Sequence, residues 1–333
     1  MSGGASAGGS AAERVGGPGP LSRASGWLRR RLVAYVETTK FRSVVLLTLG
    51  AVVGGATGLA TLTGDGAGGG LTGASAGLLA AAWARLAWAS LAVALGCMGA
   101  NAITGYIDRR MDAIMERTKH RPLPSGRLLP AESLWLGVGL ALAASAVALV
   151  TTNVWALAWL WFGLLDSTVV YNRLTKPRTP LNVILGSPAG GAPVMVGAAA
   201  VTGLPAQLVP FLAAALVVAW TPIHIWSLTI RHVDDYRRAG VPMLPVVIGI
   251  PAAARCVGGA SLALCAVATA LAVVAGFSPP ALVLTLALQV PIVGESLAVM
   301  KTPTPSRARR LFKLSSPYLA AVFVMVIWQS LAR

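Results

Sequence analysis

The stretch NAITGYIDRRMDAIMERTKHRPLPSGR, residues 101–127, is the most charged part of the chain and lies between long apolar runs. It holds Asp108, Asp112 and Glu116 in a chain with 11 acidic residues, together with six arginines and lysines. The spacing of four predicts that the three carboxylates line one helix face, with Asn101 two turns before the first. Because like charges in such a ladder repel, the spacing indicates a bound cation that bridges to an anion. A salt-bridged helix end outside a membrane explains the pattern equally well.

The composition is that of a membrane protein with several spans. Of the 333 residues, 56% are hydrophobic and 11% are charged. These values and the positive mean hydropathy argue against a soluble globular protein. The formal net charge of +16 lies in short basic clusters between apolar runs. It therefore reflects membrane topology, and no nucleic-acid partner is expected.

Nine apolar segments follow the N-terminal region, and most approach the ~20 residues that a helix needs to cross a bilayer. The sequence therefore predicts an all-α integral membrane protein, a bundle of nine transmembrane helices in the lipid bilayer. The expected spans are residues 43–61, 83–106, 131–151, 154–171, 180–201, 206–227, 247–276, 279–300 and 314–331.

Basic residues alternate between the two sides of this expected bundle. The loops after the first, third, fifth and seventh spans contain no lysine or arginine, whereas the other loops are strongly basic. By the positive-inside rule, the N-terminus is cytoplasmic and the C-terminus external. The same rule brings the stretch 101–127 and the loops 172–180 and 228–245 to one cytoplasmic face, where we expect a single site.

The N-terminal region is expected to stay outside the bundle. Residues 1–26 are rich in Gly, Ala, Ser and Pro and lack an apolar stretch, which predicts a disordered tail. Residues 27–42 read WLRRRLVAYVETTKFR, a mixture of apolar and basic residues typical of an amphipathic helix at the membrane interface. Residues 43–331 are then the transmembrane domain.

A second acidic pair, Asp234 and Asp235, follows the sixth span. Adjacent residues on a helix point about 100° apart, so at most one of the two should face a shared site. Asp235 and Tyr236 are the expected contributors. Neutralisation of the pair by nearby arginines is the alternative interpretation.

Two acidic clusters that face each other at a membrane surface suit a diphosphate held through Mg²⁺. That ion takes one or two carboxylates, waters and phosphate oxygens. Basic residues of the same face would neutralise the remaining phosphate charge, although each can also serve only to set topology. These residues are Lys119, Arg121, Arg173, Lys176 and Arg231.

Three other features lie inside the apolar segments. His224 in the sixth span is either a substrate contact or a hydrogen-bonded intramembrane residue. The motif SPAGGAPVMVG, residues 187–197, should break the fifth span with its two prolines, as helices do beside a cavity or a close contact. The three cysteines have no metal-binding or CxxC spacing and are expected to be packing residues.

Together the motifs resemble the protoheme IX farnesyltransferases, also called heme O synthases, within the UbiA superfamily of intramembrane prenyltransferases. The resemblance covers most of residues 40–330. The phrases MERTKHRPL and DDYRRAGVPMLPVV separate this family from relatives that act on hydroxybenzoate, naphthoate or chlorophyllide. The motifs are YIDRRMDAIMERTKHRPLPSGRL (106–128), YNRLTKPRTPLNVILGSPAGGAPVMVG (171–197), HIWSLTIRHVDDYRRAGVPMLPVV (224–247) and RRLFKLSSPYL (309–319).

The resemblance implies a UbiA-type bundle around a central cavity, in which the farnesyl group of farnesyl diphosphate is transferred to a vinyl group of heme b. Water addition then gives heme O, the precursor of heme A. Heme b is a substrate and not a cofactor, heme A synthase is a candidate partner, and the implied location is the inner membrane of a bacterium.

The resemblance also assigns roles to individual residues. Mg²⁺ is held by Asp108 and Asp112 with help from Asp235, Lys119 and Arg121 bind phosphate, and Glu116 forms a local salt bridge. The residues expected to contact substrate are Asn101, Tyr106, Arg117, Tyr171, Arg173, Lys176, His224, Trp226, Arg231, Asp234 and Tyr236.

The chain departs from the superfamily pattern at one position, and three alternatives compete with this interpretation. The first motif usually runs Asn-x-x-x-Asp-x-x-x-Asp, but Thr104 occupies the asparagine position, with Asn101 as a possible substitute. The first alternative is a prenyltransferase of the same superfamily that uses a quinone precursor or a chlorin. A secondary transporter would place its acidic residues near the bilayer midplane, and a non-catalytic heme protein would need axial ligands instead of paired acidic helix ends.

Overall fold

A computed structural model describes residues 20–64 and 76–332, and the secondary structure of these residues is entirely helical. Within them, nine helices are long and apolar enough to cross a membrane, which confirms the predicted number of spans. The protein is an integral membrane protein. The spans are formed by α2 (Phe41–Gly64), α3 (Ala76–Ile114), α4 (Pro130–Thr151), α5 (Val154–Leu165) with η1 (Asp166–Thr175), α6 (Asn182–Gly186) with α7 (Pro188–Thr202), α8 (Leu208–Arg231), α11 (Ile250–Val274), α12 (Pro279–Lys301) and α13 (Pro305–Leu331).

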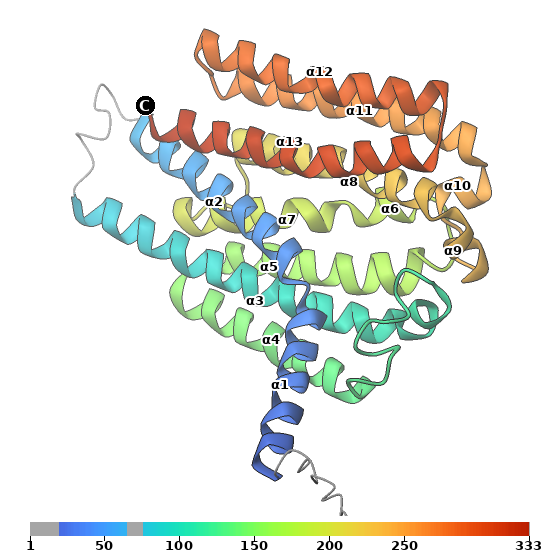
Figure 1. The fold of residues 1–333 in the computed structure, drawn as a ribbon. Coiled ribbons are helices and arrows are strands. Elements are labelled where there is room, and N and C mark those ends of the chain that lie inside the picture. The colour runs from blue at the N-terminus through green and yellow to red at the C-terminus, as the bar shows by residue number, and fades with distance from the viewer. Residues whose placement is uncertain (1–19, 65–75, 333) are drawn as a thin grey trace, which may run out of the picture.

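The spans stack side by side, from α4 at one edge to α12 at the other (Figure 1). Small residues allow the central helices α2 and α7 to approach closely, as is common between helices in membranes. A Cβ on Gly54 would lie 1.8 Å from the carbonyl oxygen of Val194, and one on Gly197 would lie 1.9 Å from that of Ala51. Helices α2 and α7 are therefore in backbone contact at the centre of the bundle.

The fifth span is broken as the sequence predicts. Helix α6 ends at Gly186 and α7 begins at Pro188, which has no backbone N–H to continue the first helix. The carboxylate of Asp166 accepts a hydrogen bond of 2.8 Å from the backbone N–H of Ala189 in the first turn of α7. A buried acidic residue from the fourth span therefore caps the second half of the fifth.

The predicted interfacial helix corresponds to α1, which runs from Pro20 to Thr39. Of the disordered tail predicted over 1–26, residues 1–19 lie outside the described residues, whereas residues 20–26 are helical and form the first part of α1. The chain bends at Lys40, whose φ of 51° is the one positive value at a non-glycine residue in the described chain, and then enters α2. Arg31 forms an ion pair with Glu132 of α4, so α1 is attached to the bundle (Figure 1).

The loop that follows α3 lies at the same end of the bundle as the short helices α9 (Val233–Arg238) and α10 (Leu244–Val247), whereas the C-terminus lies at the opposite end (Figure 1). Ion pairs and hydrogen bonds join this loop, the end of η1 and α9, as described below. The predicted convergence of three distant loops is therefore confirmed.

Candidate functional site

A polar cavity of about 260 Å³ lies where α3, η1 and α9 meet. It contains the two aspartates of the first acidic motif and side chains from several loops. We call it the polar cavity. It is lined by Lys40, Asn101, Thr104, Asp108, Met111, Asp112, Met115, Arg117, Arg121, Ser167, Tyr171, Asn172, Lys176, Ile225 and Tyr236.

The two aspartates lie one turn apart on α3, and each is paired with a base. The Oδ2 of Asp108 lies 2.6 Å from the Nζ of Lys176, and both side chains are 12% exposed. The Oδ2 of Asp112 lies 2.9 Å from an Nη of Arg121, and Asp112 is buried. Both carboxylates therefore belong to one wall of the cavity and are already matched by cations.

The expected acidic ladder stops after these two residues. Helix α3 ends at Ile114, so the prediction that Glu116 continues the same helix face is wrong. Glu116 is exposed and pairs with Lys119 at 2.6 Å, as expected for a local salt bridge. The helical spacing argument fails there because the chain has already left the helix.

Asp235 explains how the chain turns at this point. Its carboxylate accepts hydrogen bonds from the backbone N–H groups of Glu116 at 3.3 Å and Arg117 at 3.4 Å. Arg238 pairs with the same carboxylate, and the Nδ1 of His232 lies 3.9 Å from it. Asp235 therefore links the second acidic motif to the loop of the first, and it is not among the lining residues of the polar cavity.

Two lysines define the electrostatics of the polar cavity. Burial, followed by the nearby Arg121 guanidinium, lowers the pKa of Lys40 to about 8 against the opposing effect of Asp108. Burial also disfavours the ammonium of Lys176, but the charge of Asp108 and their hydrogen bond outweigh it, and the pKa of Lys176 is raised. A buried cation of this kind favours an anionic ligand beside it.

Arg117 adds an incompletely bonded guanidinium to the same cavity. One Nη donates to the Tyr236 hydroxyl at 3.3 Å, and the guanidinium carbon lies 6.0 Å from the centre of that ring. Its Nε is buried without a hydrogen-bond partner among the described residues. Because a buried donor without an acceptor is costly, this group also favours an anion in the cavity.

A π-helix, η1, shapes the wall opposite α3. Its wider turn is shown by the hydrogen bond of 2.8 Å from the N–H of Lys176 to the carbonyl of Tyr171, five residues earlier. The Asn172 amide donates to the Ser167 carbonyl at 2.7 Å and accepts from the Lys176 ammonium at 3.4 Å. π-Helical segments are rare and often occur at functional sites, where they place side chains that an α-helix would turn away.

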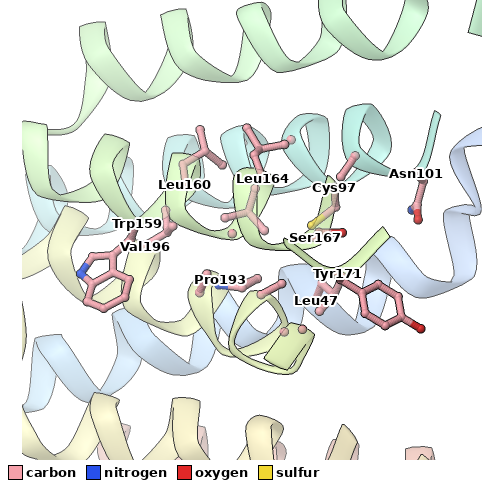
Figure 2. Close-up of a pocket in the computed structure, with 18 of the residues that line it drawn as sticks. Leu47, Cys97, Asn101, Trp159, Leu160, Leu164, Ser167, Tyr171, Pro193 and Val196 are labelled. Carbon is pink, nitrogen blue, oxygen red and sulfur yellow. The ribbon is translucent and has the colours of Figure 1, made fainter. Parts of the chain in front are cut away.

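An apolar cavity of about 300 Å³ adjoins the polar cavity inside the bundle. The two cavities share part of their wall, which is formed by Asn101, Ser167, Tyr171 and Ile225. Figure 2 shows Asn101 and Tyr171 at one end of the apolar cavity and Trp159 at the other. The site therefore combines the charged polar cavity with an adjoining apolar cavity.

Half of the residues predicted from the sequence line these cavities. Those that do are Asn101, Asp108, Asp112, Arg117, Arg121, Tyr171, Lys176 and Tyr236. Those that lie outside both are Tyr106, Lys119, Arg173, His224, Trp226, Arg231, Asp234 and Asp235.

His224 and Trp226 lie on parts of α8 that do not face the cavities. The Nδ1 of His224 lies 2.8 Å from the Ser315 Oγ, and its ring lies between Trp220 and Phe312 at centroid distances of 4.5 and 4.2 Å. The Trp226 side chain is buried. On α8, the cavity face is instead formed by Thr221 and Ile225, so His224 joins α8 to α13.

Sequence reasoning missed Lys40, Ser167 and Asn172 as cavity residues. Lys40 lies inside the helix predicted over 27–42, but the chain bends at this residue, and the bend brings the partly exposed lysine to the cavity. Ser167 and Asn172 face the cavity through the π-helix, for which the sequence gives no signal. In the described ranges no group of three or more His, Cys, Asp or Glu side chains is close enough to hold a metal ion.

Comparison with known proteins identifies relatives over most of the chain. The profile of the UbiA prenyltransferase family matches residues 67–317. A protoheme IX farnesyltransferase of Thermoplasma acidophilum is 38% identical over 239 residues, covering 72% of this chain and 83% of its own.

Solved structures share the fold at low sequence identity. The structure of a UbiA homolog from Aeropyrum pernix K1 aligns with a TM-score of 0.66 at 20% identity, covering 86% of this chain and 98% of its own. A UbiA homolog from Archaeoglobus fulgidus bound to GPP and Mg²⁺ aligns with a TM-score of 0.55 at 13% identity, covering 88% and 99%. The arrangement of helices is therefore that of a known class of membrane proteins.

Proposed function

The chain belongs to the UbiA prenyltransferase family, and on that premise we propose that it transfers the farnesyl group of farnesyl diphosphate to a vinyl group of heme b. Water addition completes the reaction, and the products are heme O and diphosphate. The observation that carries the proposal is the junction of the polar cavity, which suits a diphosphate, with an apolar cavity that suits a prenyl chain. The acceptor is proposed from the similarity to the protoheme IX farnesyltransferase of Thermoplasma acidophilum.

The charge of the polar cavity supports a diphosphate ligand. Four cations and two carboxylates line it, which leaves an excess of two positive charges. The released diphosphate carries one more negative charge than its prenyl ester, because the oxygen that leaves carbon keeps the bonding electron pair. With one bound Mg²⁺ the cavity would balance the released diphosphate better than the ester, which favours cleavage of the bond. The cations are Lys40, Arg117, Arg121 and Lys176.

We assign the Mg²⁺ site to Asp108 and Asp112. Mg²⁺ binds through one or two carboxylates with phosphate oxygens and waters completing its shell, so two acidic side chains in a phosphate site suffice. When bound, the ion would neutralise charge on the diphosphate oxygens. Asp235 has its oxygens engaged by two backbone N–H groups and Arg238, so we assign to it the positioning of the loop that carries Arg117.

In the proposed reaction, the bond between C1 of the farnesyl group and the diphosphate oxygen breaks, and its electron pair stays on the oxygen. The terminal carbon of a vinyl group then forms a bond to C1, which leaves a cation on the carbon next to the porphyrin ring. Water adds to that carbon and loses a proton. The Tyr171 side chain at the junction of the cavities would shield the first cation from water.

For location we propose the inner membrane of a bacterium, with the N-terminus and the polar cavity on the cytoplasmic side and the C-terminus outside. The basic loops of one side support this orientation by the positive-inside rule. The polar cavity lies at that end, between loops rich in lysine and arginine. Heme A synthase is the proposed partner that would take over the product.

The test is incubation of membranes containing the protein with heme b, farnesyl diphosphate and Mg²⁺, followed by mass analysis of the hemes. We expect heme O from the wild type and none from Asp112→Ala, while Asp234→Ala, changed at an exposed position, retains activity. A different prenylated acceptor in place of heme O would assign another substrate. Normal heme O formation by Asp112→Ala would refute the assigned site.

A further inference from the structure

The apolar cavity has chemically different ends. At one end Asn101 and Tyr171 join it to the polar cavity, and at the other lies the indole of Trp159 (Figure 2). Among the described residues that line this cavity, none carries a charge. A prenyl chain whose diphosphate lies in the polar cavity would therefore extend toward Trp159.

The Trp159 side chain has two contacts that orient it. Its Nε1 donates a hydrogen bond of 2.6 Å to the carbonyl of Pro205, in the loop between α7 and α8. Its ring meets that of Phe162 edge to face, with centroids 5.4 Å apart and an interplanar angle of 84°. The hydrogen bond and the ring contact favour one orientation of the indole at this end of the cavity.

The distance along the helix between Tyr171 and Trp159 fits a chain of three isoprene units. Tyr171 and Trp159 are twelve residues apart on the continuous α5–η1 helix, a rise of at most about 18 Å at ~1.5 Å per residue. Three extended isoprene units measure roughly 15 Å and four roughly 20 Å, given carbon–carbon bonds of about 1.5 Å. The fourth unit would overlap the indole.

We propose that Trp159 is a specificity-determining residue whose indole closes the apolar cavity and limits the prenyl chain to three isoprene units. This inference rests on the proposed function only in that the substrate is a prenyl diphosphate. It does not depend on the identity of the acceptor.

The test measures binding without chemistry. Purified protein with Mg²⁺ and no heme is titrated with thiolodiphosphate analogues that carry three or four isoprene units. We expect the wild type to bind the three-unit analogue about 10- to 100-fold more tightly, the range that pocket shape gives for differences in apolar groups. Trp159→Leu should lower this ratio at least ~10-fold, and Trp159→Phe, which keeps a ring, should give a smaller change.

Trp161→Leu is the matched control, because Trp161 lies on the same helix, is exposed and does not line the cavity. It should keep the wild-type ratio. Equal binding of both analogues by the wild type, or an unchanged ratio in Trp159→Leu and Trp159→Phe, would overturn the proposal. Chain-length-selective binding in a protein that makes no prenylated heme would reject the proposed acceptor and leave the role of Trp159 intact.

Discussion

The Nζ of Lys176 lies 2.6 Å from the Oδ2 of Asp108, although 68 positions separate the two residues in the chain. The contact joins the end of η1 to the first acidic motif and is nearly closed to solvent, with both side chains 12% exposed. Such a pair places a carboxylate and a cation beside the same ligand. A diphosphate with its metal ion could therefore contact both residues without a large rearrangement of the backbone.

The first prediction concerns the dependence of activity on Mg²⁺ and the part that Asp108 plays in it. Chelation should abolish activity and added Mg²⁺ should restore it, because the two carboxylates repel a diphosphate unless a bound cation lies between them. Asp108→Asn should raise the Mg²⁺ concentration for half-maximal activity by about 10-fold or more, since one of two carboxylate ligands is lost. Titration of activity with Mg²⁺ measures this. Glu116→Gln, at an exposed position outside the cavity, is the control and should leave the titration unchanged.

The adjacent aspartates of the second motif should behave differently. Asp235→Asn removes one of two acceptors for backbone N–H groups, a loss of about 1.5–3 kcal/mol for bonds to a charged group. We expect kcat/KM to fall roughly 10- to 100-fold as the 116–117 turn loses its anchor. Asp234 is 72% exposed and pairs only with Arg237 among the described residues, so Asp234→Asn should be close to wild type. Similar kinetics for the two variants would contradict the positioning role.

Gly186→Ala should disturb the site by displacing the Tyr171 side chain. A Cβ at this position would lie 2.5 Å from the Tyr171 ring and 2.6 Å from the Tyr171 Cβ, so rotation of the ring alone cannot remove the overlap. Because Tyr171 lines both cavities, we expect activity to fall about 10-fold or more at a cost of about 1–3 kcal/mol in stability. Gly139→Ala, where an added Cβ meets nothing within 4 Å, is the control. Steady-state kinetics and thermal unfolding of both variants distinguish a local from a general effect.

Gly197→Ala tests the packing of the bundle and not the site. The added Cβ would lie 1.9 Å from a backbone oxygen of α2, which cannot move aside as a side chain can. We expect the helices to separate locally and the protein to unfold at a clearly lower temperature, with a loss of at least ~3 kcal/mol. Gly259→Ala, in the interior of α11 with open space around it, should be neutral or slightly stabilising. Equal melting temperatures for the two variants would disprove the close α2–α7 crossing.

The number of spans, the broken fifth span and the convergence of the acidic motifs could be predicted from the amino-acid order. In each case the physics is local or one-dimensional: the length of an apolar segment, a proline without an N–H, and the alternation of basic loops. Asp108 and Asp112 face one cavity because four residues span about one helical turn. These features could be predicted without knowing which helices are in contact.

The tertiary structure decided which of the remaining polar residues face the cavity. Glu116 does not extend the row of acidic residues on α3 because that helix ends at Ile114. The Asp235 carboxylate instead accepts a hydrogen bond from the backbone of the loop that follows. Asn172 faces the cavity only because the π-helix widens the turn, and Lys40 only because the chain bends before α2. In each case the direction of a side chain depends on a contact between segments far apart in the chain or on a local change of helix pitch. Periodicity within the amino-acid sequence could not reveal either.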